Sequence, residues 1–156
     1  MNVTLFSDGS SKGNPGPGGF GTVIHYTDKS GELHVLELTE GYRETTNNRM
    51  ELLGVISGLE ALTKPCDVTV VSDSKYVTDA FNQNWVEGWL KTNWKKGTVK
   101  NIDLWKRLLK AMEPHNVRFT WVKGHAGHPE NERCDLLACT SAEGENLLTD
   151  YGFEGK

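Results

Sequence analysis

The sequence predicts an α/β fold in which helices pack on a mixed sheet. Three strand-like segments joined by short turns come first, and helical and strand-like segments then alternate to the end of the chain. The chain has 156 residues, of which 37% are hydrophobic and 24% charged, enough for one domain with a real core. A three-strand meander followed by alternating helices and strands is typical of a mixed sheet covered by helices.

The three leading strands are expected at about residues 2–8, 19–27 and 32–42. In the first of them, Val3 and Leu5 alternate with polar residues, as in a strand that buries one face. The stretch "TDKSGE" supplies the hairpin turn between the second strand and the third.

A change to helical periodicity follows the third strand. Leu52, Val55, Ile56 and Leu59 recur at the spacing of one helix face, and Pro65 ends that helix. The elements expected after it are a strand at 67–73, a helix at 74–82, an irregular aromatic and basic stretch at 84–100, a helix at 101–112, a strand at 117–122 and a last helix that Pro129 opens.

No repeat, low-complexity tract or linker divides the chain, so we expect one domain over residues 1–143 and a polar, loosely packed tail over 144–156. No apolar run approaches the roughly 18 residues of a bilayer span, and no signal peptide is visible. Three scattered cysteines (Cys66, Cys134 and Cys139) indicate reduced thiols. We therefore expect a cytoplasmic protein with no membrane partner, and a monomer by default.

The charge is unevenly distributed. The net charge of −4 argues against a generally basic nucleic-acid-binding surface. Residues 91–110, however, carry seven lysine or arginine residues against one aspartate, a local charge of +6 that leaves −10 for the rest of the chain.

The glycine-rich stretch "FSDGSSKGNPGPGGFG" raises the question of a phosphate-binding loop. It lacks the Lys-Ser/Thr pair of a P-loop. A dinucleotide fingerprint would be followed by a helix, whereas "GGFGTVIHY" indicates a strand. What remains is Asp8 at the end of a strand, with an Asx-turn role as the alternative.

Three further acids fall at element ends. Glu51 points to the buried side of its helix, unless it forms a capping box with Asn48. Asp73 ends the strand at 67–73, where ligands gather in open sheets, unless it caps the next helix. Asp135 lies one turn into the last helix, where a solvated helix face is the alternative.

Taken together, Asp8, Glu51, Asp73 and Asp135 predict a site for divalent cations. Clustered carboxylates cannot all stay ionised without cations, and hard oxygen ligands select Mg²⁺ or Mn²⁺. Two such ions about 4 Å apart suit phosphodiester cleavage, one at the attacking oxygen and one at the leaving oxygen. His125, in the loop that also holds His128, is our candidate proton carrier.

A nucleic acid is the partner that the aromatic and basic stretch favours. We expect Trp85, Trp89 and Trp94, which alternate with lysines, to contact it. Trp105 lies on an amphipathic helix and is expected in the core. The stretch "TTNN" (45–48) offers short polar groups and backbone N–H groups to a phosphate or a 2′-hydroxyl.

Five motifs in one order resemble the bacterial type 1 ribonuclease H family: "FSDGSSKGNPGPGGFG", "TTNNRMEL", "SDSKYV", "KNIDLW" and "WVKGHAGHPENERCD". The resemblance covers residues 2–142. It implies a five-stranded mixed sheet whose first three strands are antiparallel, with helices on both faces. It also implies cleavage of the RNA strand of RNA–DNA hybrids, leaving 5′-phosphate and 3′-hydroxyl ends.

The resemblance further implies roles for individual residues. The metal-binding carboxylates correspond to Asp8, Glu51, Asp73 and Asp135, and the catalytic loop histidine to His125. The family's basic protrusion corresponds to residues 81–101. The family's hybrid-binding residues correspond to Asn14, Thr46, Asn47, Asn48 and Asn101. We expect further substrate contacts from Ser11, Lys75, Trp85, Trp89 and Lys100.

The sequence departs from the family pattern at two positions and in one segment. Ser11 and Lys75 stand where cysteine and glutamine are familiar, and the protrusion lacks a dense lysine/arginine run. We therefore expect hybrid binding to respond less to salt than in a more basic relative. Two alternatives stay open, a hybrid-binding module without catalysis and a related nuclease or integrase that acts on DNA.

Overall fold

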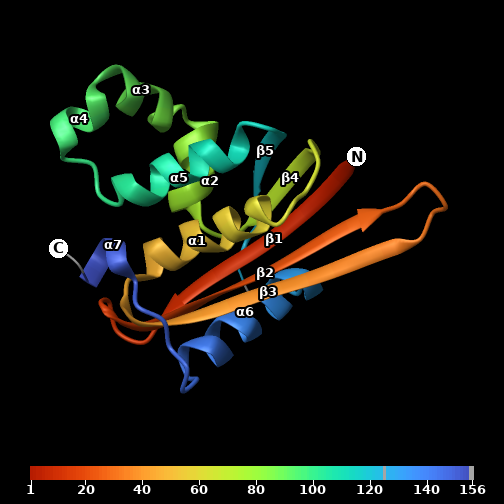
Figure 1. Cartoon of the computed structure of the whole chain (residues 1–156), viewed down its shortest axis with the longest axis horizontal. Helices are drawn as coiled ribbons and strands as arrows, with labels where there is room; N and C mark the ends of the chain where they lie inside the picture. The colour runs from red at the N-terminus through yellow and green to blue at the C-terminus, as the bar shows by residue number, and fades with distance from the viewer. Residues whose placement is uncertain (125, 155–156) are drawn as a thin grey trace.

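The computed structural model describes residues 1–124 and 126–154. Five strands form one mixed sheet in the order β3-β2-β1-β4-β5 (Figure 1). The pairs β1–β2 and β2–β3 are antiparallel, and β1–β4 and β4–β5 are parallel. The predicted mixed sheet with three leading antiparallel strands is therefore confirmed. The strands are β1 (Asn2–Ser11), β2 (Gly16–Thr27), β3 (Leu33–Thr45), β4 (Asp67–Ser72) and β5 (Asn116–Trp121).

Helices cover both faces of this sheet. Thr22 of β2 donates a hydrogen bond to Gly54 of α1 (Asn47–Glu60), so this side of the strand faces α1. A side chain at the neighbouring Gly21 would instead collide with the backbone of Cys134 in α6 (Pro129–Ala142). Because adjacent strand residues point to opposite faces, α1 and α6 lie on opposite sides of the sheet.

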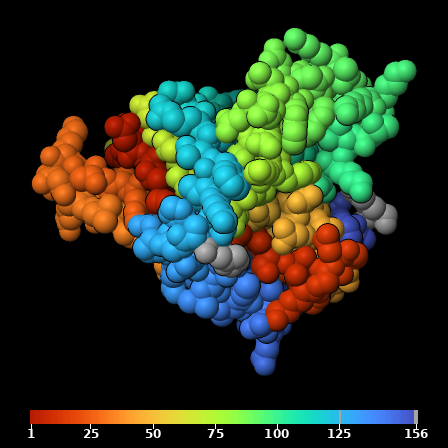
Figure 2. Space-filling view, turned by 180° about the vertical axis from the view of Figure 1, so that it is seen from behind, coloured from red at the N-terminus to blue at the C-terminus, as the bar shows by residue number. Residues whose placement is uncertain are grey.

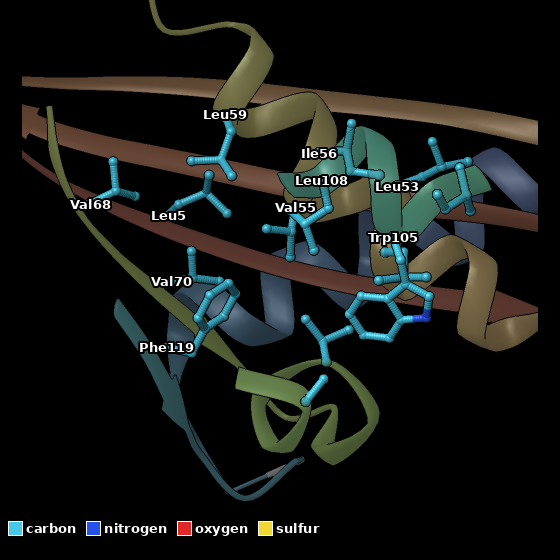
Figure 3. Close-up of a cluster of buried hydrophobic side chains, with 14 of the residues drawn as sticks. Leu5, Leu53, Val55, Ile56, Leu59, Val68, Val70, Trp105, Leu108 and Phe119 are labelled. Carbon is cyan, nitrogen blue, oxygen red and sulfur yellow. The ribbon is translucent and has the colours of Figure 1, made fainter. Parts of the chain in front are cut away.

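The core lies between the sheet and α1. Leu5, Val68 and Val70 of the central strands are fully buried against α1, and Phe119 of β5 adds to the same cluster (Figure 3). The α1 side of the sheet also carries α2 (Lys75–Asn82), α3 (Trp85–Lys91), α4 (Asn93–Gly97) and α5 (Ile102–Met112). Trp105 of α5 is completely buried, which confirms its predicted place in the core.

The stretch at 84–100 is more ordered than predicted. It forms α3 and α4, which project as a lobe at one end of the molecule (Figure 2). The expectation that Trp94 contacts a partner is wrong, because its side chain is only 5% exposed and packs near Trp89. Left-handed backbone angles at residues 93–96 accompany this inward orientation, a conformation that local sequence patterns do not indicate.

The loose packing expected after Glu143 is also wrong. Leu148 donates its backbone N–H to Gly41 and accepts one from Arg43, so the segment is hydrogen-bonded to β3. A short helix α7 (Tyr151–Glu154) follows, and the carboxylate of Asp150 just before it is buried. Long-range pairing of this kind leaves no trace in the polar composition of the tail.

Candidate active site

Three carboxylates from three separate elements meet at the carboxyl end of the central strands. Asp8 lies in β1, Glu51 in α1, and Asp73 directly after β4. Each offers an oxygen atom, and these three atoms all lie within 4.8 Å of one another. Parallel pairing aligns Ser7 with Ser72, which brings the following residues, Asp8 and Asp73, to the same edge of the sheet.

The absence of a side chain at Gly9 lets α1 approach β1 closely enough to place Glu51 at this edge. An added Cβ at Gly9 would collide with the backbone N–H of Glu51 and would lie 2.9 Å from its Oε1. Glycine is therefore the residue that fits where the helix meets the strand. The capping-box alternative for Glu51 fails, because Thr46 caps α1 by accepting a hydrogen bond from the Arg49 N–H.

The alternative roles of the other acids can also be compared with the structure. Ser74, not Asp73, caps α2 through its hydroxyl group. Asp8 accepts a hydrogen bond of 2.9 Å from the Gly9 N–H, which uses only one of its lone pairs. Neither local role therefore accounts for the meeting of the three acids.

Asp135 stands beside this three-carboxylate cluster and is not one of the residues within 4.8 Å. Its charge is close enough to raise the pKa of Asp8. Its Oδ1 lies 3.7 Å from the Cys139 thiol, which also lies 3.7 Å from the hydroxyl of Ser10 in β1. The first turns of α6 therefore face the same end of β1 as the cluster.

The electrostatics of the cluster favour a bound cation. Burial, followed by the charge of Asp73, raises the pKa of Asp8 from 3.8 to about 7. Burial, reinforced by Asp8 and Asp73, also raises the pKa of Glu51 well above its usual range. The Oε1 atom of Glu51 is buried, and no described residue gives it a hydrogen bond. An unpartnered oxygen among hard oxygen donors fits a divalent cation.

A groove lies one helical turn along α1 from the cluster. It has a volume of about 740 Å³ and continues from the start of α1 to the loop before α5. Glu51 and Asn48 lie three residues apart on α1, so the cluster and the groove share one helix. Five predicted substrate residues line the groove: Asn14, Thr46, Asn48, Lys100 and Asn101.

Other predicted substrate residues do not line this groove. The backbone N–H of Asn47 donates to Asn14 Oδ1 at 3.1 Å, which ties the loop before β2 to the start of α1. Trp85 is 44% exposed and lines a second hollow with Trp89, whose ring also packs against Trp105. Ser11 ends β1 with a partly exposed side chain.

Lys75 has a neighbour that sequence reasoning missed. Its ammonium group lies 4.8 Å from the ring centroid of Trp121, and the Trp121 indole N–H donates to the backbone carbonyl of Asp73. Trp121 is 42% exposed at the end of β5. Its place beside the cluster depends on the β4–β5 pairing, and an aromatic residue at a strand end gave no signal by itself.

The predicted proton carrier, His125, lies outside the described residues. His128 occupies the position before α6 without a capping hydrogen bond from its side chain.

The sequence model of the family described as RNase H matches residues 1–143. The chain belongs to the RNase H family. It is 59% identical to a ribonuclease H of Lachnoclostridium phytofermentans, over 99% of this chain and 100% of that protein. It is 52% identical to a ribonuclease H of Desulforamulus reducens, over 95% of this chain and 92% of that protein. The resemblance inferred from the motifs is confirmed, and the chain is a hydrolase of the ribonuclease H class.

Solved RNase H structures share the fold. LC9-RNase H1, described as a type 1 RNase H with the type 2 active-site motif, superposes with a TM-score of 0.84 and is 33% identical in sequence. That match covers 99% of this chain and 79% of LC9-RNase H1. An RNase H1 of Halobacterium salinarum gives a TM-score of 0.64 at 26% identity, over 90% of this chain and 97% of the other.

No helix in residues 1–124 and 126–154 has both the length and the apolar character that a membrane crossing requires.

Proposed function

We propose that this enzyme cleaves the RNA strand of RNA–DNA hybrids with two divalent cations, Mg²⁺ or Mn²⁺, and leaves 5′-phosphate and 3′-hydroxyl ends. The observation that carries the proposal is the meeting of Asp8, Glu51 and Asp73, with one buried carboxylate oxygen unpartnered among the described residues. Membership of the RNase H family supports the reaction class. A solved relative, LC11-RNase H1, is in complex with an RNA/DNA hybrid.

Asp8, Glu51, Asp73 and Asp135 would hold the cations. When bound, the cations would supply positive charge to the attacking water and to the leaving oxygen. The water oxygen forms a bond to phosphorus, and the bond from phosphorus to the 3′ oxygen breaks. The attacking water gives up one proton and the departing 3′ oxygen takes one up, and we assign His125 as the carrier for this proton transfer.

The groove and the projecting lobe would hold the substrate. Asn14, Thr46 and Asn48 offer short polar groups to phosphate or to 2′-hydroxyls, and Lys100 offers a positive charge. Trp85 is exposed enough to lie against a sugar or a base. Contacts to both strands at once would discriminate against pure RNA and pure DNA.

We also propose a monomer that acts in the cytoplasm. All three cysteines are unpaired, which suits a reducing compartment.

The deciding experiment compares a labelled RNA–DNA hybrid with matched RNA and DNA duplexes, in Mg²⁺ and without it. We expect cleavage of the hybrid's RNA strand only, and its loss in Asp8→Asn because a metal ligand loses its charge. Asp67→Asn is the matched control, since Asp67 lies at the opposite end of β4 from Asp73. Hybrid binding without cleavage would favour a non-catalytic module, and cleavage of the DNA duplex would favour a DNA nuclease.

His125→Ala tests the proposed proton carrier. We expect slower hybrid cleavage with unchanged Mg²⁺ binding, measured by calorimetric titration, because the carboxylates stay in place. An unchanged rate would remove His125 from the mechanism.

A further inference from the structure

A buried ion-pair network connects the C-terminal segment to the groove described above. Arg49 of α1 is 1% exposed, and its guanidinium contacts Asp150 at 2.7 and 2.9 Å. It also donates to both oxygens of Asp103, at 2.9 and 2.8 Å. A fifth hydrogen bond, of 3.3 Å, reaches Oδ1 of Asn101, a groove residue.

These five hydrogen bonds use all five N–H donors of the guanidinium. Arg49 therefore has no donor left for a phosphate, although it lies next to the proposed substrate residues. Two carboxylates outnumber its single charge. The side chain is built to support its neighbours rather than to bind an anion itself.

The amide of Asn101 is held from two sides. Its Oδ1 accepts from Arg49, and its Nδ2 donates to the Tyr76 hydroxyl at 3.0 Å. The second N–H of Nδ2 remains for a ligand. Asn101 also has a left-handed backbone conformation, with φ 64°, which asparagine adopts more readily than most non-glycine residues.

The C-terminal segment closes the network from outside. Asp150 is 5% exposed, and its carboxylate also accepts a hydrogen bond of 2.7 Å from the Thr45 hydroxyl. Gly152 and Phe153 line the groove themselves. A side chain at Gly152 would collide with Asp103 and would lie 2.6 Å from Arg49, so the tail backbone lies directly against the ion pair. The family match ends at residue 143, before this segment.

We propose that residues 147–154 are a positioning element of the hybrid-binding groove, in which Asp150 fixes Asn101 through Arg49. The inference rests on the proposed function, because it takes Asn101 to contact the hybrid. Asp150 is a positioning residue, since it acts through Arg49. Loss of its charge should weaken hybrid binding and leave the chemical step at the three-carboxylate cluster largely intact.

The test measures kcat and KM for hybrid cleavage in Asp150→Asn, Asn101→Ala and the double variant. We expect Asp150→Asn to raise KM about tenfold with kcat little changed, the size expected when a hydrogen bond to a charged group is lost. In the Asn101→Ala background the same substitution should have almost no further effect on KM. Glu60→Gln is the matched control, because it breaks an exposed pair with Arg107 at the other end of α1, outside this segment, and should leave KM unchanged.

The outcomes separate this inference from the function it rests on. If Asn101→Ala leaves KM unchanged, the groove assignment is wrong. If Asn101→Ala raises KM but Asp150→Asn does not, or if Asp150→Asn raises KM equally in both backgrounds, the positioning role is overturned. Should Asp150→Asn fail to fold, Thr45→Val makes the same test more gently, because it removes one hydrogen bond to Asp150 and keeps the charge. We expect a smaller rise in KM that also vanishes in Asn101→Ala, and no rise overturns the proposal.

Discussion

Two buried charges on α1, two residues apart, have opposite surroundings. Arg49 is 1% exposed and all five of its donors are hydrogen-bonded, four of them to carboxylates. Glu51 is 6% exposed, faces the carboxylates of Asp8 and Asp73, and keeps an oxygen that no described residue partners. Loss of one partner from a satisfied buried ion pair destabilises the fold, whereas a buried oxygen without a hydrogen-bond partner marks a place for an external ligand.

Protonation responds differently in the two regions. Burial lowers the pKa of Arg49, but its hydrogen bonds to Asp103 and Asp150 outweigh burial and raise that pKa overall, so the ion pair stays charged. Burial raises the pKa of Glu51, and its acidic neighbours raise it further. The fold therefore supplies the countercharges for Arg49 and leaves those for Glu51 to a cation from solution.

The largest expected effect is on catalysis. Glu51→Gln should lower kcat for hybrid cleavage in Mg²⁺ on the order of a thousandfold, because cation stabilisation of the transition state amounts to several kcal/mol. Glu60→Gln is the control on the same helix, since Glu60 is exposed and pairs with Arg107. If both variants kept full activity, the unpartnered oxygen would have no catalytic meaning.

Replacing the two buried charges should change the free energy of unfolding in opposite directions. Arg49→Met removes the guanidinium that pairs with Asp103 and Asp150 and should lower the free energy of unfolding by about 3–5 kcal/mol. Urea denaturation without divalent cations measures this, and Glu51→Gln should be more stable than the parent under the same conditions. Arg107→Met, which breaks only the exposed pair with Glu60, should cost about 1 kcal/mol or less. Equal losses in the two arginine variants would contradict the comparison.

The three acids of the cluster could be predicted from the sequence. Asp73 follows the end of β4 and Glu51 lies on a buried helix face, as predicted, whereas Asp8 lies within β1, which continues past the predicted strand end to Ser11. The sheet topology then brings the three together. Local periodicity placed every strand and the long helices. It is informative there because burial on one face imposes a spacing of 2.0 or 3.6 residues.

The ion-pair network of Arg49 could not be predicted from the sequence. The partners of Arg49 lie 54 and 101 residues away along the chain, and no periodicity connects them. The predicted loose tail and the exposed Trp94 failed for the same reason, because polar composition and lysine spacing do not report long-range packing. Trp121 went unnoticed because its contacts with Asp73 and Lys75 exist only once β5 pairs with β4.

The pH dependence of stability should reveal the raised pKa of Asp8. The pKa of Asp8 rises from 3.8 in the unfolded chain to about 7 in the folded protein, so the folded state binds the proton more tightly. Without divalent cations, stability should therefore be highest below about pH 4 as far as Asp8 is concerned, and should fall as pH rises through 7. In EDTA at pH 7.5, we expect Asp8→Asn to exceed the parent by about 1–3 kcal/mol in urea unfolding, with little difference at pH 4.

Magnesium provides the control for that measurement. Added Mg²⁺ should stabilise the parent at pH 7.5 and not Asp8→Asn, because binding to the folded state alone raises its stability. If the free energy of unfolding of the parent rose with pH in EDTA, the carboxylates of the cluster would not repel one another in the folded protein.

The smallest expected effect concerns salt. The Arg49 guanidinium is already neutralised by carboxylates, so it should release no counterions from the hybrid and add nothing to the salt dependence of binding. The groove residue Lys100 should contribute to that salt dependence. For Lys100→Gln, the slope of log K against log salt for hybrid binding should become shallower by roughly 0.7–0.9, the contribution of one phosphate contact. Lys29→Gln, in the hairpin between β2 and β3, should leave the slope unchanged.

The parent's slope should also be shallower than that of a relative with a more basic protrusion, because fewer phosphates are neutralised. An equal or steeper slope would mean that the paired guanidinium or other cations on this surface reach the backbone of the hybrid after all.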